Sequence, residues 1–223
     1  LGDAQTIGQY FCTTSTIRKL SFTGSTAVGR LLIAQSAHNV QKLSMELGGN
    51  APFIVLDSAN LDTVCAGMLR SKFRNSGQAC ISANRFIIVQ SRYDEVLSKL
   101  TNTATDLTVG AAFQDSSPTE TDIGPLISLK AVDKLYRLLT DALQKGAYLH
   151  HGSLPDRTST FVQPIILTNV TPSMDLWWEE LFGPVIACTI ASDTAEAVRL
   201  ANNSQHGLGA YLFTQDPIEI ERI

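Results

Sequence analysis

Cysteine is scarce in this sequence, and its distribution excludes two kinds of small domain. Only four cysteines occur in 223 residues, and they are widely separated. None belongs to a CxxC pair and none lies near a histidine at zinc-site spacing, so no metal site is expected. The chain is also longer than the secreted domains that depend on disulfides. The pattern favours a reducing compartment, either the cytoplasm or the mitochondrial matrix.

Long hydrophobic runs and basic runs are missing as well. An apolar run such as residues 86–89 is far shorter than the roughly 20 residues that a membrane-spanning helix needs. Lysine and arginine number 17 against 21 aspartates and glutamates, which gives a net charge of −4. We therefore expect neither a membrane nor a nucleic acid as a partner.

Short apolar runs alternate with amphipathic stretches along the chain. The apolar runs predict strands at residues 19–22, 42–47, 52–56, 85–90, 147–152, 162–167, 184–190 and 207–214. The amphipathic stretches predict helices at residues 26–38, 60–75, 92–106, 129–145 and 194–203, and the polar residues 110–128 are expected to be irregular. This alternation predicts an α/β fold with largely parallel sheets. The glycines at 48 and 49 indicate a boundary between domains of residues 1–47 and 48–223.

Residues 21–30, SFTGSTAVGR, form a turn between a predicted strand and a predicted helix. Backbone N–H groups at such a helix N-terminus bind phosphate well. The stretch is not an ATP-hydrolysing P-loop, because Arg30 and Leu31 stand where that motif needs Lys and Ser or Thr. The alternative is an ordinary capped helix with Ser25 or Thr26 as the N-cap.

Acidic residues occur at two positions where a predicted strand meets a glycine-containing turn. Glu46 ends an apolar run just before Gly48, and a carboxylate there can act as a general base. Glu179 and Glu180 precede a Leu-Phe-Gly-Pro turn. The alternatives are an ion-paired or surface glutamate in the first case and a solvated acidic turn in the second.

Cys80 differs from the other cysteines in its surroundings. It follows a predicted helix directly and has polar neighbours at Gln78, Ser82 and Asn84. A thiol at such a corner can be exposed and activated by nearby N–H dipoles and positive charge. The alternative is a small buried hydrophobic residue, which fits Cys12, Cys65 and Cys188 better.

Five motifs taken together resemble the aldehyde dehydrogenase superfamily over essentially the whole chain. They are FTGSTAVG at 22–29, MELGGNAP at 45–52, GQAC at 77–80, IGPLI at 123–127 and EELFGPV at 179–185. The glutamate and cysteine motifs lie 34 residues apart (80 − 46), as in that family. The resemblance implies the end of a Rossmann-type cofactor domain followed by an α/β catalytic domain that is incomplete at its C-terminus.

The same resemblance implies roles for individual residues and a cofactor, NAD or NADP. Cys80 would attack an aldehyde carbonyl, and Glu46 would activate the water that hydrolyses the resulting thioester. Glu179 would have a structural or surface role. The expected cofactor-binding residues are Gly24, Ser25, Gly29, Leu47, Glu180 and Phe182.

Arg74 narrows the expected substrate. The stretch KFRNSGQAC looks most like succinate-semialdehyde dehydrogenases, in which an arginine six residues before the cysteine binds the far carboxylate of the substrate. A guanidinium matches a carboxylate with two parallel hydrogen bonds. The alternative for Arg74 is a surface arginine paired with an acid. Ser82 excludes the redox switch in which a second cysteine stands two residues after Cys80. The alternatives for the protein are a related semialdehyde or aromatic-aldehyde dehydrogenase, or a non-catalytic structural relative.

The ends of the chain are interpreted as internal to a longer polypeptide. The first residue is Leu1, and the last stretch, DPIEIERI, reads as the opening of a helix. The resemblance places the oxyanion-binding Asn and the adenosine contacts upstream of this chain. We therefore expect the isolated chain to lack dehydrogenase activity and the complete protein to form a homodimer or homotetramer.

Overall fold

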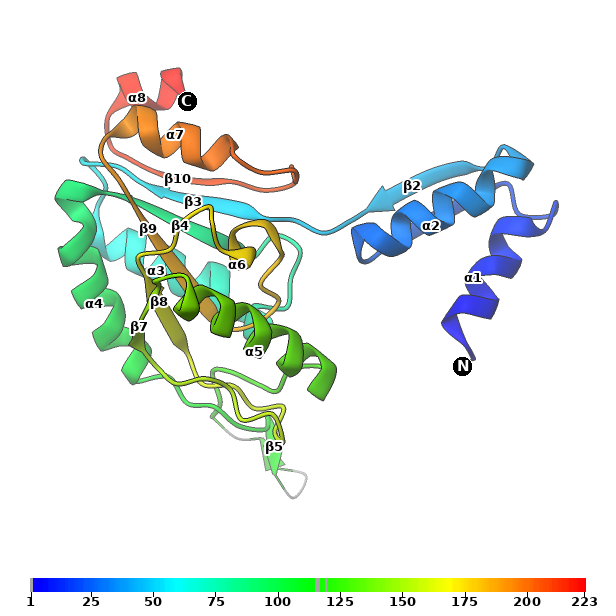
Figure 1. Ribbon diagram of the computed structural model, residues 1–223, viewed down its shortest axis with the longest axis horizontal. Helices are drawn as coiled ribbons and strands as arrows, with labels where there is room; N and C mark the ends of the chain where they lie inside the picture. The colour runs from blue at the N-terminus through cyan, green and yellow to red at the C-terminus, as the bar shows by residue number, and fades with distance from the viewer. Residues whose placement is uncertain (1, 115–116, 119) are drawn as a thin grey trace. The chain divides into compact units, whose positions relative to one another are not determined.

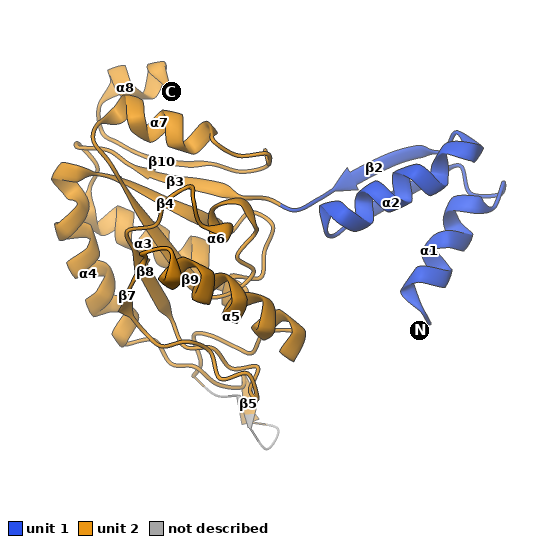
Figure 2. Ribbon diagram, in the orientation of Figure 1, with its two compact units in different colours: residues 1–48 blue, residues 49–223 orange. Residues whose placement is uncertain are grey.

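The computed structural model describes residues 2–114, 117–118 and 120–223. The chain divides into two compact units, Leu1–Gly48 and Gly49–Ile223 (Figures 1 and 2). Each unit has its own strands and its own packed side chains, and each is described separately below.

The first unit is a small α/β element built on two parallel strands. In order, it contains α1 (Ala4–Thr13), β1 (Lys19–Thr23), α2 (Thr26–Ser36), the 3-10 turn η1 (Ala37–Asn39) and β2 (Lys42–Glu46). β1 and β2 pair in parallel, with Phe22 opposite Met45. Asp3 caps α1 by accepting a hydrogen bond from the Thr6 backbone N–H. The sequence patterns did not predict α1.

The second unit is built around one sheet with the strand order β10-β3-β4-β9-β8-β7. Neighbouring strands are parallel except for β7 and β8, which pair antiparallel. The bounds are β3 (Ala51–Val55), β4 (Ala83–Val89), β7 (Tyr148–His151), β8 (Ile165–Thr168), β9 (Val185–Ala191) and β10 (Tyr211–Phe213). The prediction of an α/β fold with largely parallel sheets is confirmed.

Helices cover both faces of this sheet, because its central strands are apolar on both sides. One buried cluster joins Phe53 and Phe86 to α3 and α4, and the other joins Ile54 and Ile87 to α5, α6 and α7. The helices are α3 (Leu61–Phe73), α4 (Tyr93–Thr105), α5 (Leu129–Gln144), α6 (Asp175–Trp178), α7 (Thr194–Asn202) and α8 (Pro217–Arg222). The shorter elements are η2 (Arg74–Gly77), η3 (Gln90–Arg92), β5 (Phe113–Gln114) and β6 (Ser117–Pro118).

The structure corrects one element boundary that matters for the site. The predicted helix at 60–75 ends at Phe73, because Asn75 and Ser76 adopt left-handed backbone angles (φ 51° and 58°). The antiparallel pair β5–β6 lies inside the stretch predicted to be irregular, of which residues 115, 116 and 119 fall outside the described residues.

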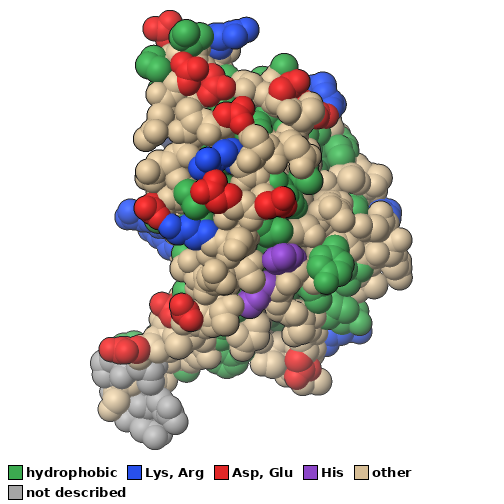
Figure 3. All heavy atoms as spheres, turned by 90° about the vertical axis from the view of Figure 1, so that its left-hand side faces the viewer, with side chains coloured by type: hydrophobic (Ala, Val, Ile, Leu, Met, Phe, Trp, Pro, Cys, Tyr) green, Lys and Arg blue, Asp and Glu red, His purple; other side chains and the backbone are tan. Residues whose placement is uncertain are grey.

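No helix among the described residues is long and apolar enough to cross a membrane. On the face of the molecule shown in Figure 3, acidic and basic side chains are interspersed. The described side chains in that view therefore form no continuous basic surface of the kind that binds nucleic acid.

Candidate active site

Cys80 lies on a short connection between the end of α3 and the start of β4. Three consecutive residues there, Asn75, Ser76 and Gly77, have positive φ angles, so the chain turns back sharply after the helix. The Ser76 hydroxyl donates to the carbonyl of Gly124 at 2.9 Å. Because side chains as well as backbone fix the turn, the position of Cys80 is set by the folded unit.

A second contact holds the Cys80 connection onto the IGPLI motif. The Gln78 side chain accepts a hydrogen bond from the Ile127 backbone N–H at 2.8 Å and donates to the Pro125 carbonyl at 3.2 Å. The Gln78 side-chain amide thus provides hydrogen-bond partners for two backbone groups in a segment that belongs to no strand. This gives the motif at residues 123–127 a physical role that the sequence alone left unassigned, namely to support the cysteine turn.

Cys80 opens onto a cavity of about 600 Å³. Phe53, Tyr211 and Phe213 form an apolar part of its wall, and Arg74 is also among the residues that line it. Cys80 is half-buried, whereas the other cysteines are buried: Cys12, Cys65 and Cys188. Burial raises the pKa of the Cys188 thiol to about 12 and also raises the pKa of Cys65. Cys80 is therefore the cysteine that an external electrophile can reach.

Gly49 packs directly against the backbone of Cys80. A Cβ atom added at Gly49 would lie 2.2 Å from the Cys80 carbonyl oxygen, a separation that no side chain tolerates. The Gly49 backbone N–H donates to Glu180 Oε1 at 3.4 Å. Burial raises the pKa of the Glu180 carboxyl. Within the second unit, the end of the MELGGNAP motif, the cysteine turn and the second acid of the Glu pair therefore meet.

Four residues of the predicted cofactor site, Gly24, Ser25, Gly29 and Leu47, lie in the first unit. Gly24 follows β1, and its N–H donates to the Glu46 carbonyl at 3.0 Å. The Ser25 hydroxyl accepts a hydrogen bond from the Val28 N–H at 3.3 Å and so caps α2. This is the arrangement of the capped-helix alternative, with Ser25 as the N-cap. Gly29 is buried, and a Cβ there would lie 2.5 Å from the Leu47 side chain, so the absence of a side chain lets helix and strand pack closely.

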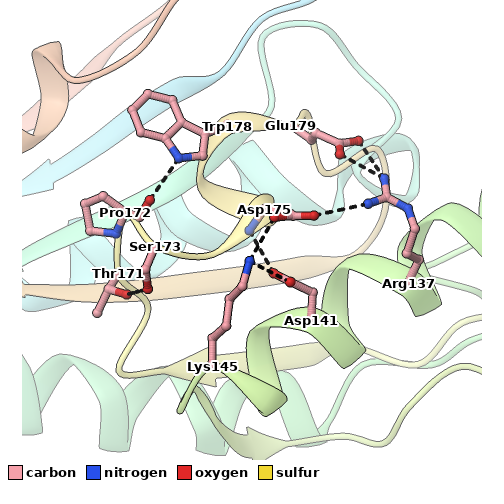
Figure 4. Close-up of polar contacts among 9 residues, drawn as sticks. All are labelled: Arg137, Asp141, Lys145, Thr171, Pro172, Ser173, Asp175, Trp178 and Glu179. Carbon is pink, nitrogen blue, oxygen red and sulfur yellow. Dashed lines mark hydrogen bonds and ion pairs between the residues drawn. The ribbon is translucent and has the colours of Figure 1, made fainter.

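Glu179 and Glu180, although adjacent, have different surroundings. Glu179 accepts two hydrogen bonds from Arg137 at 2.7 and 2.9 Å (Figure 4). Arg137 also pairs with Asp175, which in turn pairs with Lys145. Glu179 is thus part of an ion-pair network between α5 and α6, in agreement with a structural role. Sequence patterns could not reveal this network, because its α5 and α6 partners lie 30 to 42 residues apart.

Phe182 is half-buried and lines a second hollow of about 530 Å³, together with Asn75, Gln78 and Pro125. This hollow shares Asn75 with the Cys80 cavity. The hollow lined by Phe182, a predicted cofactor contact, and the cavity lined by Cys80, the predicted nucleophile, therefore meet at Asn75. No group of three His, Cys, Asp or Glu residues that could hold a metal ion occurs among the described residues.

Lys72 is a buried cation that sequence reasoning missed. Its ammonium group donates to Asn84 Oδ1 at 2.8 Å and to the Leu181 carbonyl at 2.7 Å. It therefore connects α3, the start of β4 and the turn after Glu180. Burial lowers the pKa of Lys72 to about 7, while the nearby Glu180 carboxylate opposes that shift. One signal was available, since Lys72 lies four residues after Met68, on the buried face of the helix.

The lowered pKa of Lys72 predicts a pH-dependent stability. The folded protein releases this proton near pH 7, whereas an unfolded lysine keeps it to about 10.5. The unfolded state thus binds more protons between these values, so this group makes the free energy of unfolding rise with pH, by at most about 1.4 kcal/mol per unit. Urea unfolding at pH 7 to 10 should show that wild type gains stability relative to Lys72→Met. A difference that stays constant or shrinks over this range would contradict the assignment.

The aldehyde dehydrogenase family pattern matches residues 1–223. The mitochondrial succinate-semialdehyde dehydrogenase of Rattus norvegicus is 41% identical over 222 residues, which are 99% of this chain and 42% of that protein. The NADP(+) succinate-semialdehyde dehydrogenase GabD of Escherichia coli (strain K12) is 41% identical over 223 residues, which are 100% of this chain and 45% of that protein.

A solved structure shows the same likeness in three dimensions. The crystal structure of succinate-semialdehyde dehydrogenase from Burkholderia pseudomallei aligns with a TM-score of 0.93 and 44% sequence identity. The alignment covers 100% of this chain and 45% of that one. The chain thus spans less than half the length of the relatives it matches.

Proposed function

Because the chain belongs to the aldehyde dehydrogenase family, we propose that it supplies the nucleophile and part of the substrate cavity of a dehydrogenase. The reaction is the NAD- or NADP-dependent oxidation of succinic semialdehyde to succinate. Relatives named for succinate semialdehyde support this substrate, and one of them is named for NADP(+). Assembly as a homodimer or homotetramer stays a prediction.

The observation that carries the proposal is that Cys80 and Arg74 line one cavity. The Arg74 side chain is exposed and makes no hydrogen bond or ion pair with any of the described residues. Its guanidinium is free to take a carboxylate in two parallel hydrogen bonds. An aldehyde with an acid at its far end would then present its carbonyl carbon to the thiol.

The chemistry begins with the Cys80 sulfur. The thiolate forms a bond to the carbonyl carbon, and the carbonyl oxygen takes the negative charge. The Cys80 backbone N–H donates to no acceptor among the described residues, so it can stabilise that oxyanion. Loss of a hydride from the same carbon leaves a thioester, and Glu46 accepts a proton from the water that hydrolyses it to the acid.

The residues around the β1–α2 turn fit a dinucleotide. Ser25 satisfies only the Val28 N–H of the first turn of α2, so other N–H groups of that turn are left to bind a pyrophosphate near Gly24. In the proposal, Leu47, Glu180 and Phe182 contact the nicotinamide end of the cofactor. Gly29 is buried and has no side chain, which keeps the helix close to the strand. When bound, NAD or NADP accepts the hydride.

Arg74→Ala tests the substrate assignment in the complete polypeptide that contains this chain. Relative to kcat/KM for butanal, kcat/KM for succinic semialdehyde should fall by about 10- to 100-fold, because the two charge-assisted hydrogen bonds between guanidinium and carboxylate are lost. Arg222→Ala, at an exposed arginine outside the cavity, is the matched control. With cofactor and substrate, trapped acyl groups should be found on Cys80. An unchanged ratio would overturn the role of Arg74, and the absence of an acyl adduct would overturn the reaction.

A further inference from the structure

Arg70 is a second arginine among the residues that line the Cys80 cavity. It lies four residues before Arg74, which is about one turn of helix. Like that of Arg74, its side chain is exposed and makes no hydrogen bond or ion pair with the described residues. No acidic residue is among the described residues that line this cavity.

The helix dipole alone does not account for this pair. Basic side chains near the end of a helix are favoured by its dipole, and both arginines are close to the end of α3. Like charges four residues apart, however, repel each other. The acidic side chain on α3, Asp62, is engaged by Lys99 at the other end of the helix. Two cationic residues therefore line one cavity, and none of the described residues that line it is acidic.

We propose that Arg70 is a second carboxylate-binding residue, used by ω-oxo acids with longer chains than succinic semialdehyde. Four residues of helix place Arg70 about 6 Å further back along the helix axis than Arg74, a distance spanned by about four or five methylene groups. The apolar wall at Phe53, Tyr211 and Phe213 suits such a methylene chain. The proposal rests on the proposed function in one respect, that Cys80 is the reacting group.

Carboxyalkyl maleimides of different length test this on the chain as it is. All carry the same thiol-reactive double bond, to which the Cys80 sulfur adds while the neighbouring carbon takes a proton. N-carboxymethylmaleimide has a short acid arm and N-carboxypentylmaleimide a long one. N-ethylmaleimide and N-hexylmaleimide are neutral counterparts of similar length. Peptide mass spectrometry gives the rate of labelling at Cys80, and the buried cysteines report any unfolding.

The expected result is a length-dependent effect of each arginine. Arg70→Gln should lower the acid-to-neutral rate ratio for the long reagents by about tenfold and change the short ratio less than about twofold. Arg74→Gln should do the reverse. Arg222→Gln removes the same charge at an exposed site outside the cavity and should change neither ratio.

Two results would overturn the proposal. In one, Arg70→Gln leaves the long ratio unchanged. In the other, Arg70→Gln lowers the acid-to-neutral rate ratios of the long and the short reagents equally, which is the effect expected from the general loss of a positive charge. Neither depends on cofactor or turnover. A failure of the proposed function is seen separately, as the absence of an acyl adduct on Cys80.

Discussion

Replacing Arg85 with methionine is expected to lower the free energy of unfolding of the second unit by about 3 to 5 kcal/mol. Arg85 is 1% exposed and lies in β4. Its guanidinium donates to the carbonyls of Asn50, Leu200, Ala201 and Asn203, at 2.9 to 3.3 Å. Methionine has similar bulk but no donor, so each of these buried carbonyls would lose the donor that the guanidinium provides.

The position of those carbonyls explains why the loss should be large. Three of them lie at the C-terminal end of α7, where a helix leaves its last carbonyls without helical partners: Leu200 and Ala201 in the last turn and Asn203 at the C-cap. The Leu200 carbonyl also accepts from the Asn203 N–H at 3.1 Å, and the Asn203 carbonyl from the Trp177 indole N–H at 3.0 Å. The fourth belongs to Asn50, whose side chain also donates to the Trp177 carbonyl at 2.8 Å. The guanidinium lies 5.3 Å from the Trp177 ring centre. Arg85 therefore joins β4, α6, α7 and the segment that follows Gly49.

Burial lowers the pKa of Arg85 to about 10, so the side chain remains charged at neutral pH. The charge is balanced by carbonyl dipoles, since no described acidic residue forms an ion pair with it. Arg85→Lys keeps the charge but has fewer donors in a different geometry, and should recover only part of the stability.

Urea unfolding followed by tryptophan fluorescence isolates this unit, because both tryptophans of the chain, Trp177 and Trp178, lie within it. Arg222→Met, at an exposed position, is the matched control and should change the free energy of unfolding by less than about 0.5 kcal/mol. A loss below 1 kcal/mol in Arg85→Met would mean that water replaces the guanidinium without cost.

Local periodicity was enough to predict most of the fold. The runs at 52–56 and 85–90 have too few polar residues for a surface strand, and they form the buried strands β3 and β4. A domain boundary was predicted at Gly48 and Gly49, because two adjacent glycines interrupt an otherwise regular alternation, and it stays a prediction. α1 was not predicted, because Cys12 is its only buried residue and its sequence therefore has no apolar stripe of the usual width.

The parts of the site that could not be predicted depend on contacts between distant residues. Lys72 reaches Leu181, 109 residues away, and Arg85 reaches Leu200, 115 residues away. Neither partner is a charged residue, so no pattern of opposite charges marks the pair. The kink after Phe73 was hidden for another reason, since Asn75 and Ser76 are compatible with a helix until tertiary contacts force a turn.

Cys80 and Arg74 could be singled out because the motif that contains them is short and contiguous. Their presence in one cavity is a product of that same kink, which turns the chain between them. The residues predicted to bind cofactor are divided between two compact units, with Gly24, Ser25, Gly29 and Leu47 in the first. Glu180 and Phe182 lie with the cysteine turn in the second.

Gly77→Ala is expected to destabilise the second unit by about 2 to 4 kcal/mol and to displace Cys80. Gly77 has a φ of 75°, which disfavours alanine by about 1 kcal/mol. A Cβ there would also lie 2.2 Å from the Gly183 carbonyl oxygen and 2.8 Å from that of Lys72. Both are backbone atoms, so the overlap can be relieved only if the cysteine turn moves away from residues 179–183.

Gly146→Ala separates the two causes. Gly146 has a φ of 100°, and nothing lies within 4 Å of a Cβ built there, so this variant carries backbone strain without overlap. It should cost about 1 kcal/mol and leave the rate of Cys80 alkylation by N-ethylmaleimide unchanged. Gly77→Ala should change that rate by about threefold or more, because the thiol is repositioned as the turn moves. Equal stability losses in the two variants, with equal alkylation rates, would show that the turn can adapt in place. The contact between Gly77 and Gly183 would then not fix the position of the nucleophile.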